Sequence, residues 1–258
     1  MPRYFIEVSY KGTGYSGFQV QRNANTIQSE IEKALERCFR KSFSLTGSSR
    51  TDAGVHALQN YFHFDSETEL TREADDDSGS ERKMERYLYS LNAILPANIV
   101  VQKIALVEDN THSRFDAVSR EYKYQLYQRK NPFYKSTAYY YPYRLDIRKL
   151  QEAAAVIAGS HDFTAFSKRN TQVKDFNCSI TTSDWFIEND LIIYNVIGNR
   201  FLRGMVRGLV GTMLKVGSGK ISLQGLEEIL RSKDCASADF SAPPQGLFLV
   251  HVTYPFKI

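Results

Sequence analysis

The chain has 258 residues, of which 42% are hydrophobic and 13% aromatic, and this is enough for a sizeable core in one large domain or two smaller ones. Its net charge of +4 permits an RNA partner without demonstrating one. No apolar run reaches the roughly 18 residues of a membrane span. Charges in the N-terminal segment MPRYFIEVSY argue against a signal peptide, so we expect a cytoplasmic protein with no membrane partner.

Hydrophobic periodicity predicts both strands and helices in the first part of the chain. Residues 3–10 alternate between apolar and polar and are typical of a half-buried strand, whereas residues 26–39 have helical spacing with Thr26 as a good N-cap. We expect the remaining elements here to be a strand at 60–65, a helix at 81–91 and a strand at 99–107.

The acidic stretch 73–81, EADDDSGSE, is the only strongly biased segment. A run of acids that ends in Ser-Gly-Ser predicts a solvated loop that caps the next helix. We do not expect RNA to bind against this negative charge.

The second part of the chain repeats the same kinds of element, and its expected strands and helices are 120–128, 146–158, 180–187, 191–197, 201–216, 223–231 and 247–253. Two αβ halves of similar content predict an α+β fold with largely antiparallel sheets. We place the boundary near Asp109, which gives an N-terminal subdomain at 1–108 and a C-terminal subdomain at 109–258.

Two glycine-rich segments look like phosphate-binding motifs and fail as such. GTGYSG at 12–17 matches the dinucleotide fingerprint, but the next helix is expected about nine residues later, so no helix N-terminus faces a pyrophosphate. In GSGK at 217–220, Leu214 stands where a P-loop needs glycine and Ile221 where it needs Ser or Thr.

The sequence gives no indication of a metal or disulfide framework. Cys38, Cys178 and Cys235 are widely spaced without a CxxC pair, so we expect buried free thiols. The five histidines show no metal-ligand spacing. We therefore predict no metal.

The octapeptide RTDAGVHA at 50–57 is the most informative segment. It places Asp52 in a glycine-relieved turn, two residues after Arg50. If the backbone is extended, the two side chains share a face and the guanidinium favours the charged carboxylate. By pattern alone, a charged turn with an Asx-type hydrogen bond is the better explanation of these residues.

This octapeptide resembles the catalytic signature of the TruA family of tRNA pseudouridine synthases. Segments 10–19, 112–127, 199–216 and 241–255 are similar to other family segments in the family's order, so the resemblance covers nearly the whole chain. One departure is Phe18, where the family usually has tryptophan. The resemblance implies that the two halves join into one broad sheet, with the active site in the cleft between them.

The resemblance also implies a reaction, in which uridine becomes pseudouridine at positions 38–40 of the tRNA anticodon stem-loop. The N1–C1′ bond breaks, the uracil turns, and C5 bonds to C1′. A single carboxylate can serve such an isomerisation as nucleophile, base or electrostatic stabiliser, without a cofactor. The family's essential aspartate corresponds to Asp52, and its arginine, implicated in unstacking the target base, corresponds to Arg50.

Substrate-binding residues are expected in the second half. Tyr122 matches the family tyrosine that stacks on the target uracil, although period-2 alternation with Tyr124 also fits core packing. Basic residues on the expected helix 201–216 and just before it form a stripe that can bind phosphates or merely face solvent. The candidate phosphate ligands are Arg200, Arg203 and Arg207, with Lys168, Arg169, Arg114 and Lys123 as weaker candidates.

The partners implied are tRNA and a second copy of the chain, because the family works as a homodimer.

Two other functions remain open. A synthase with the same chemistry on another RNA site would keep Asp52, Arg50 and Tyr122. A non-catalytic RNA-binding protein is the alternative from another class, although simple binding gains nothing from a carboxylate near phosphates.

Overall fold

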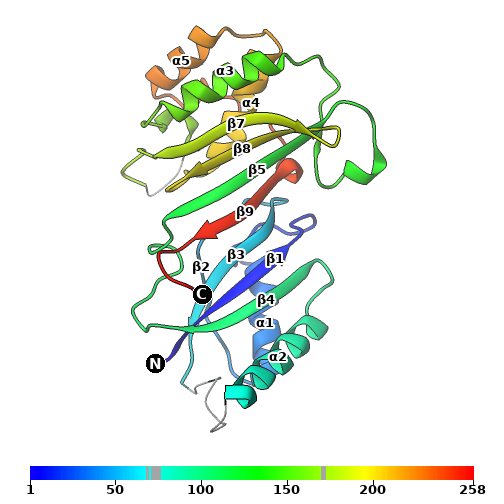
Figure 1. Cartoon of the computed structure of the whole chain (residues 1–258), viewed down its shortest axis with the longest axis vertical. Helices are drawn as coiled ribbons and strands as arrows, with labels where there is room; N and C mark the ends of the chain where they lie inside the picture. Colours follow the sequence, from blue (N-terminus) through cyan, green and yellow to red (C-terminus); the bar gives the residue numbers. More distant parts are fainter. Residues whose placement is uncertain (68–69, 71–76, 170–172) are drawn as a thin grey trace. The chain divides into compact units, whose positions relative to one another are not determined.

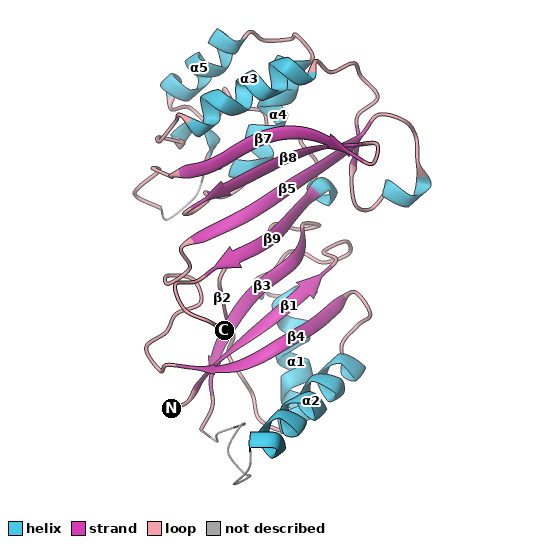
Figure 2. Ribbon diagram, viewed as in Figure 1, coloured by secondary structure: helices cyan, strands magenta, loops and turns pink. Residues whose placement is uncertain are grey.

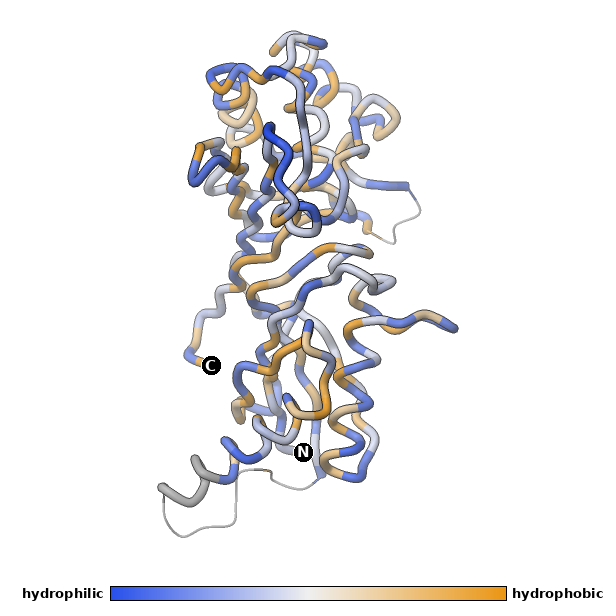
Figure 3. Tube along the Cα trace, turned by 90° about the vertical axis from the view of Figure 1, so that its right-hand side faces the viewer, coloured by the Kyte–Doolittle hydropathy of each residue, from blue (hydrophilic) through white to orange (hydrophobic). Residues whose placement is uncertain are grey.

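The computed structural model describes residues 1–67, 70, 77–169 and 173–258. Two compact units form: Met1–Val118 with Leu249–Ile258, and Ser119–Phe248. The first unit therefore contains both ends of the chain. Hydrophobic and hydrophilic residues alternate along the helices and strands (Figure 3), as expected for elements that bury only one face.

The first unit is built on an antiparallel sheet with β1 at its centre. Ile6 of β1 lies opposite Phe62 in β3 on one side and Ile104 in β4 on the other, and all three side chains are buried. The last part of β9 lies beside β3 (Figure 1). The strands are β1 (Arg3–Tyr10), β2 (Thr46–Gly47), β3 (His56–Asp65), β4 (Ile99–Val107) and β9 (Leu247–Thr253).

Two helices, α1 (Ile27–Phe39) and α2 (Asp77–Ile94), belong to this first unit. Thr26 caps α1 as predicted: its side chain accepts a hydrogen bond from Ser29 N, and Ser29 Oγ accepts one from Thr26 N. Helix α1 lies behind the strands in the view of Figure 2, and its apolar stripe is buried.

In the second unit, β8 lies between β5 and β7 and pairs with both in antiparallel, and β6 pairs with β5 in parallel. Its strands are β5 (Ser119–Tyr127), β6 (Tyr139–Tyr140), β7 (Ile180–Glu188) and β8 (Leu191–Gly198). Its helices, which gather beside β7 and β8 in Figure 1, are α3 (Ile147–Ala158), α4 (Met205–Gly217) and α5 (Leu223–Ser232). Short 3-10 turns are η1 (Pro132–Tyr134), η2 (Thr164–Phe166) and η3 (Pro244–Gly246).

These units confirm the predicted mixed α/β class with largely antiparallel strands. None of the helices in the described ranges combines the length and hydropathy that a membrane crossing needs. Cys178 is a buried free thiol as expected, and burial raises its pKa to about 11, whereas Cys38 and Cys235 are free and only half-buried.

Two predicted helix starts were wrong by four residues. Residues 77–81 were expected in the acidic loop, but α2 already begins at Asp77; the rest of that loop, 73–76, lies outside the described residues. Helix α4 begins at Met205 rather than at 201, because Gly204 adopts a left-handed conformation with φ of +73° that interrupts the helix.

Candidate active site

Asp52 begins a tight turn in the first unit, immediately before β3. Val55 N donates a hydrogen bond to Asp52 O at 3.1 Å, and Gly54 has a φ of +80°. A positive φ at the third position of such a turn is the feature that calls for glycine. The Asp52 side chain is half-buried and Arg50 is exposed, so the turn holds the carboxylate at the surface of the unit.

Buried hydrogen bonds fix the backbone on the N-terminal side of Asp52. The hydroxyl oxygens of Tyr10 and Thr51 lie 2.9 Å apart. Asn60 Nδ2 donates both to Tyr10 Oη and to Ser49 O, each at 3.1 Å. Since these groups are buried, losing one partner costs more than an exposed hydrogen bond would.

The glycine-rich loop 12–17 supports the same turn from the other side. Gly12 N donates to His56 Nδ1 at 3.0 Å, and a Cβ at Gly12 would lie 2.0 Å from Val55 O. Gly17 has a φ of +102°, and a Cβ there would lie 3.2 Å from Thr51 O. The glycines therefore let one backbone approach another, a structural role that agrees with the rejection of a dinucleotide site.

Phe18, the departure from the family's tryptophan, is a core residue. Its ring stacks on Phe62 with centroids 4.6 Å apart, and its side chain is 2% exposed. Its edge fills the space over Gly47, where a Cβ would lie 2.1 Å from Phe18 Cζ. Phe18 N also donates to Thr51 O at 3.1 Å, so this packing is tied directly to the Asp52 turn.

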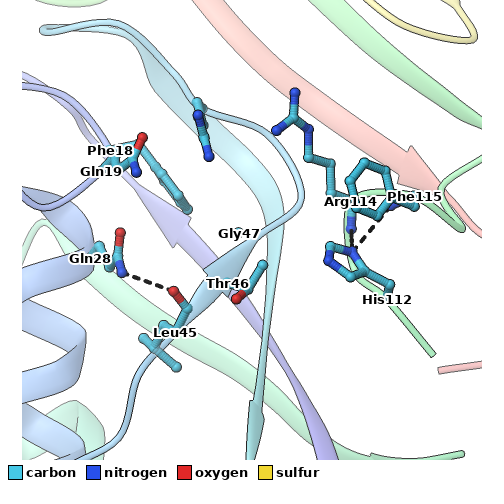
Figure 4. Close-up of a pocket in the computed structure, with 10 residues that line it drawn as sticks. Phe18, Gln19, Gln28, Leu45, Thr46, Gly47, His112, Arg114 and Phe115 are labelled. Carbon is cyan, nitrogen blue, oxygen red and sulfur yellow. Dashed lines mark hydrogen bonds between the residues drawn. The ribbon is translucent and has the colours of Figure 1, made fainter. Parts of the chain in front are cut away.

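Arg50 lines a cavity of about 230 Å³ in the first unit. Across this cavity lie His112, Arg114 and Phe115 (Figure 4). Arg114 was a weaker candidate from the sequence, whereas His112 and Phe115 belong to the family-like segment 112–127 and were not singled out as site residues. In the sequence, Arg114 and Phe115 are an Arg-Phe pair in a short segment between two strands. This pattern is too common to predict a binding site.

Two histidines lie close together on this side: His112 lines the cavity, and His63 pairs with Thr46 of β2. Burial, with Arg3 as the next contributor, lowers the pKa of His63 to about 4. The pKa of His112 is also lowered by burial. Their rings make an edge contact with centroids 4.6 Å apart. Both imidazoles are therefore neutral near pH 7.

Tyr122, in the second unit, lies on β5 and is half-buried. Its ring meets Phe201 edge-on, with centroids 5.0 Å apart. Tyr124 on the same strand is completely buried and donates to Pro243 O at 2.8 Å, so core packing accounts for that tyrosine. Tyr122 retains an accessible portion.

The predicted basic stripe does not form on one helix. Arg200 and Arg203 precede α4, and only Arg207 lies on it. Arg200 pairs with Asp175 at 3.7 Å, the Arg203 side chain is exposed, and Arg207 Nε donates to Ala242 O at 2.7 Å. The expectation that these arginines form one helical stripe was wrong, because the left-handed Gly204 lies between Arg203 and Arg207 and the helix begins only after it.

Two of the weaker basic candidates, Lys168 and Arg169, lie in the second unit. Lys168 N donates to Arg203 O at 3.1 Å, and Lys168 Nζ lies 5.9 Å from the centroid of Phe240. Arg169 is exposed and pairs with Asp234 at 3.5 Å. Lys168 and Arg203 are thus neighbours, whereas Asp52 and Arg50 belong to the other unit.

Among the described residues, no cluster of three or more His, Cys, Asp or Glu side chains has the arrangement of a metal site. In the first unit, the half-buried Asp52 carboxylate and the exposed Arg50 guanidinium lie on the same short segment. Together they suit a reaction at a bound anion or at a sugar carbon.

Comparison with known proteins gives concordant results along the chain. Residues 6–116 and 153–255 match a family described as tRNA pseudouridine synthase. A tRNA pseudouridine synthase A of Parabacteroides distasonis is 42% identical over 258 residues, which cover 100% of this chain and 98% of the relative. The Porphyromonas gingivalis protein of the same name is 39% identical, with 99% and 98% covered. A Staphylococcus aureus protein of that name is 35% identical, with 96% and 89% covered.

Proposed function

Because the chain belongs to the tRNA pseudouridine synthase family, we propose that it isomerises uridine to pseudouridine at positions 38–40 of the tRNA anticodon stem-loop. Asp52 is the catalytic carboxylate in this proposal, and the reaction uses no cofactor. The enzyme works in the cytoplasm, where its tRNA substrate is found.

The observation that carries the proposal is the position of Asp52. The residues just before it are held by Tyr10, Asn60 and Phe18, yet the Asp52 side chain keeps an exposed portion. A rigid turn that presents one carboxylate suits a reaction in which positioning matters more than strong binding.

The bonds balance without an external reactant. The N1–C1′ bond breaks and its electrons stay on the uracil, which turns and bonds through C5 to C1′. The hydrogen on C5 then leaves as a proton, and N1 regains one. Arg50 helps to take the target base out of its stack, because a guanidinium can contact phosphate and base at once.

Tyr122 supplies the aromatic face for the extruded uracil in this proposal. Its edge contact with Phe201 fixes the ring without covering it completely. The phosphate ligands are Arg200, Arg203, Arg207, Lys168 and Arg169. A homodimer completes the assembly, as in the family that the sequence resembles, and light scattering tests it with an expected mass of twice that of the chain.

The experiment uses unmodified tRNA transcripts with tritium at C5 of uridine. One transcript carries uridine at positions 38–40, and a matched transcript carries none there. We expect tritium release from the first and none from the second. Equal release from both would move the target to another RNA site, and release from neither with intact binding would contradict a synthase acting on tRNA.

A further inference from the structure

The cavity lined by Arg50 has the size of a small, single-ring or double-ring group. Sites for drug-sized ligands usually have volumes of about 300–1,000 Å³, and this cavity has about 230 Å³. All of its lining residues belong to the first unit. Since Arg50 precedes Asp52 by only two residues, a group bound here is a near neighbour of one held at Asp52.

One side of the cavity is rigid. Thr46 and Gly47 form β2, which pairs with His63 and Phe62 of β3. Phe18 is clamped between Gly47 and Phe62. This side of the cavity therefore exists before any ligand arrives.

The other side carries an exposed aromatic ring. The Phe115 side chain is 74% exposed, although a phenylalanine usually gains by burial. Figure 4 shows Phe115 beside Arg114 and His112. The guanidinium carbon of Arg114 lies 5.8 Å from the Phe115 ring centroid. An aromatic face next to a cation suits a group that is both planar and anionic.

Hydrogen bonds hold the segment that carries this ring. Arg114 N and Phe115 N both donate to His112 Nδ1, at 3.1 and 3.3 Å. His112 N donates to Asp116 Oδ2 at 2.7 Å. Ser113 Oγ donates to Thr46 O at 2.9 Å, which ties the segment to β2. Phe115 is therefore displayed on a preorganised support, and binding against it needs little ordering of the chain.

The charge of the cavity points to an anion. Its lining includes the guanidinium groups of Arg50 and Arg114 and contains no carboxylate. Arginine is well suited to phosphate because its planar fork can make two parallel hydrogen bonds.

We propose that this cavity binds one unstacked nucleotide of the RNA substrate, a close neighbour of the target uridine. Its base stacks on Phe115, and its phosphates contact Arg114 and Arg50. This inference rests on the proposed function, because it names a second RNA contact of the same site. It makes Phe115 a binding residue for the flanking nucleotide and leaves the chemistry to Asp52.

The first test replaces the ring. Base stacking on an aromatic side chain is worth about 1–3 kcal/mol by alanine substitution, so Phe115→Ala should weaken tRNA binding about 5- to 150-fold. Phe115→Trp should restore most of the binding. Tyr89→Ala is the matched control, because Tyr89 is 79% exposed in the same unit and lies outside the cavity lining. It should bind tRNA like the wild type.

A second measurement identifies what the ring contacts. Anticodon stem-loop RNAs with one abasic site each are titrated against wild type and Phe115→Ala by fluorescence anisotropy. We expect one position near the target at which removal of the base weakens RNA binding by the wild type but does not weaken binding by Phe115→Ala any further. Unchanged binding by Phe115→Ala, or equal losses at every abasic position, would overturn the inference.

The two proposals fail separately. If the wild type releases no tritium from tRNA, the proposed function fails. The titrations of abasic RNAs against wild type and Phe115→Ala still test whether the cavity binds a nucleotide. If tritium release is normal and removing a base weakens binding equally in wild type and Phe115→Ala at every position, only the assignment of the cavity fails. The melting temperature of each variant is measured by thermal denaturation, and a value like that of the wild type confirms that the variant folds.

Discussion

The phenolic oxygen of Tyr10 lies 2.9 Å from Oγ1 of Thr51, the residue immediately before Asp52. Tyr10 ends β1 and is 4% exposed, and the same oxygen accepts a hydrogen bond from Asn60 Nδ2. The end of the central strand thus sets the position of the proposed catalytic turn through one buried hydroxyl group.

Tyr10→Phe removes this hydroxyl and keeps the ring. Because Thr51 and Asn60 then lose a buried partner, we expect the free energy of unfolding to fall by about 1–3 kcal/mol. The kcat for tritium release should fall while the Kd for tRNA stays the same, since only the turn is loosened. Tyr61→Phe is the control, because it loses a hydrogen bond to Glu7 instead. Equal kcat values in the two variants would contradict this role.

Gly12→Ala should damage the site severely. A Cβ at Gly12 would lie 2.0 Å from Val55 O, so the loop and the Asp52 turn would have to separate. Gly14→Ala is the matched control, because Gly14 has a φ of +89° with nothing within 4 Å, and it should cost only about 1–2 kcal/mol of backbone strain. Circular dichroism melting and tritium release measure both. Similar melting temperatures for the two variants would contradict the close approach.

The pH dependence of stability should reflect His63. Its pKa is lowered to about 4 in the folded chain by burial, whereas an unfolded histidine titrates near 6.5. The unfolded state therefore binds the proton first, and stability is complete above pH 6.5 and falls as the pH drops toward 4. The loss is on the order of 2–3 kcal/mol.

Urea denaturation between pH 7 and pH 4.5 tests this dependence. The His63→Gln variant should show a flatter profile than the wild type, because it lacks the titrating imidazole. His251→Gln replaces an exposed histidine of the same unit and is the control for the effect of a histidine-to-glutamine substitution as such. A His63→Gln profile as steep as that of the wild type would contradict the assignment.

Arg203 and Arg207 should respond differently to truncation. The Arg203 side chain is exposed, so Arg203→Ala should keep the wild-type melting temperature, weaken tRNA binding and reduce the salt slope of binding by about one. Arg207 Nε donates to Ala242 O, so Arg207→Ala should also lower the melting temperature. Identical melting temperatures for the two variants would show that the contact of Arg207 is not structural.

The sequence predicted the elements whose signals are local. Hydrophobic spacing placed β1, α1, α3 and β4 within a residue of their ends, and the predicted cap of α1 at Thr26 forms through its own side chain. Strand β3 begins four residues earlier than predicted. Its first residues are defined by a partner, since Ala57 pairs with Tyr10, and that pairing cannot be read from one segment alone.

The candidate site was predictable only in part, for the same reason. Asp52 and Arg50 share one short motif that the sequence displays directly. The hydrogen bonds of Tyr10, Asn60 and Gly12 to the turn join residues more than ten positions apart. Phe115 becomes notable only through its exposure in the fold, because an isolated phenylalanine in the sequence predicts a core residue.

The most direct test of the central claim is the rate of tritium release under single-turnover conditions by Asp52→Asn. Asparagine has nearly the same shape, so the turn and the binding of tRNA should be retained while the negative charge is lost. We predict unchanged tRNA affinity and melting temperature with no measurable release. Release at a rate near that of the wild type would contradict the claim that the Asp52 carboxylate performs the reaction.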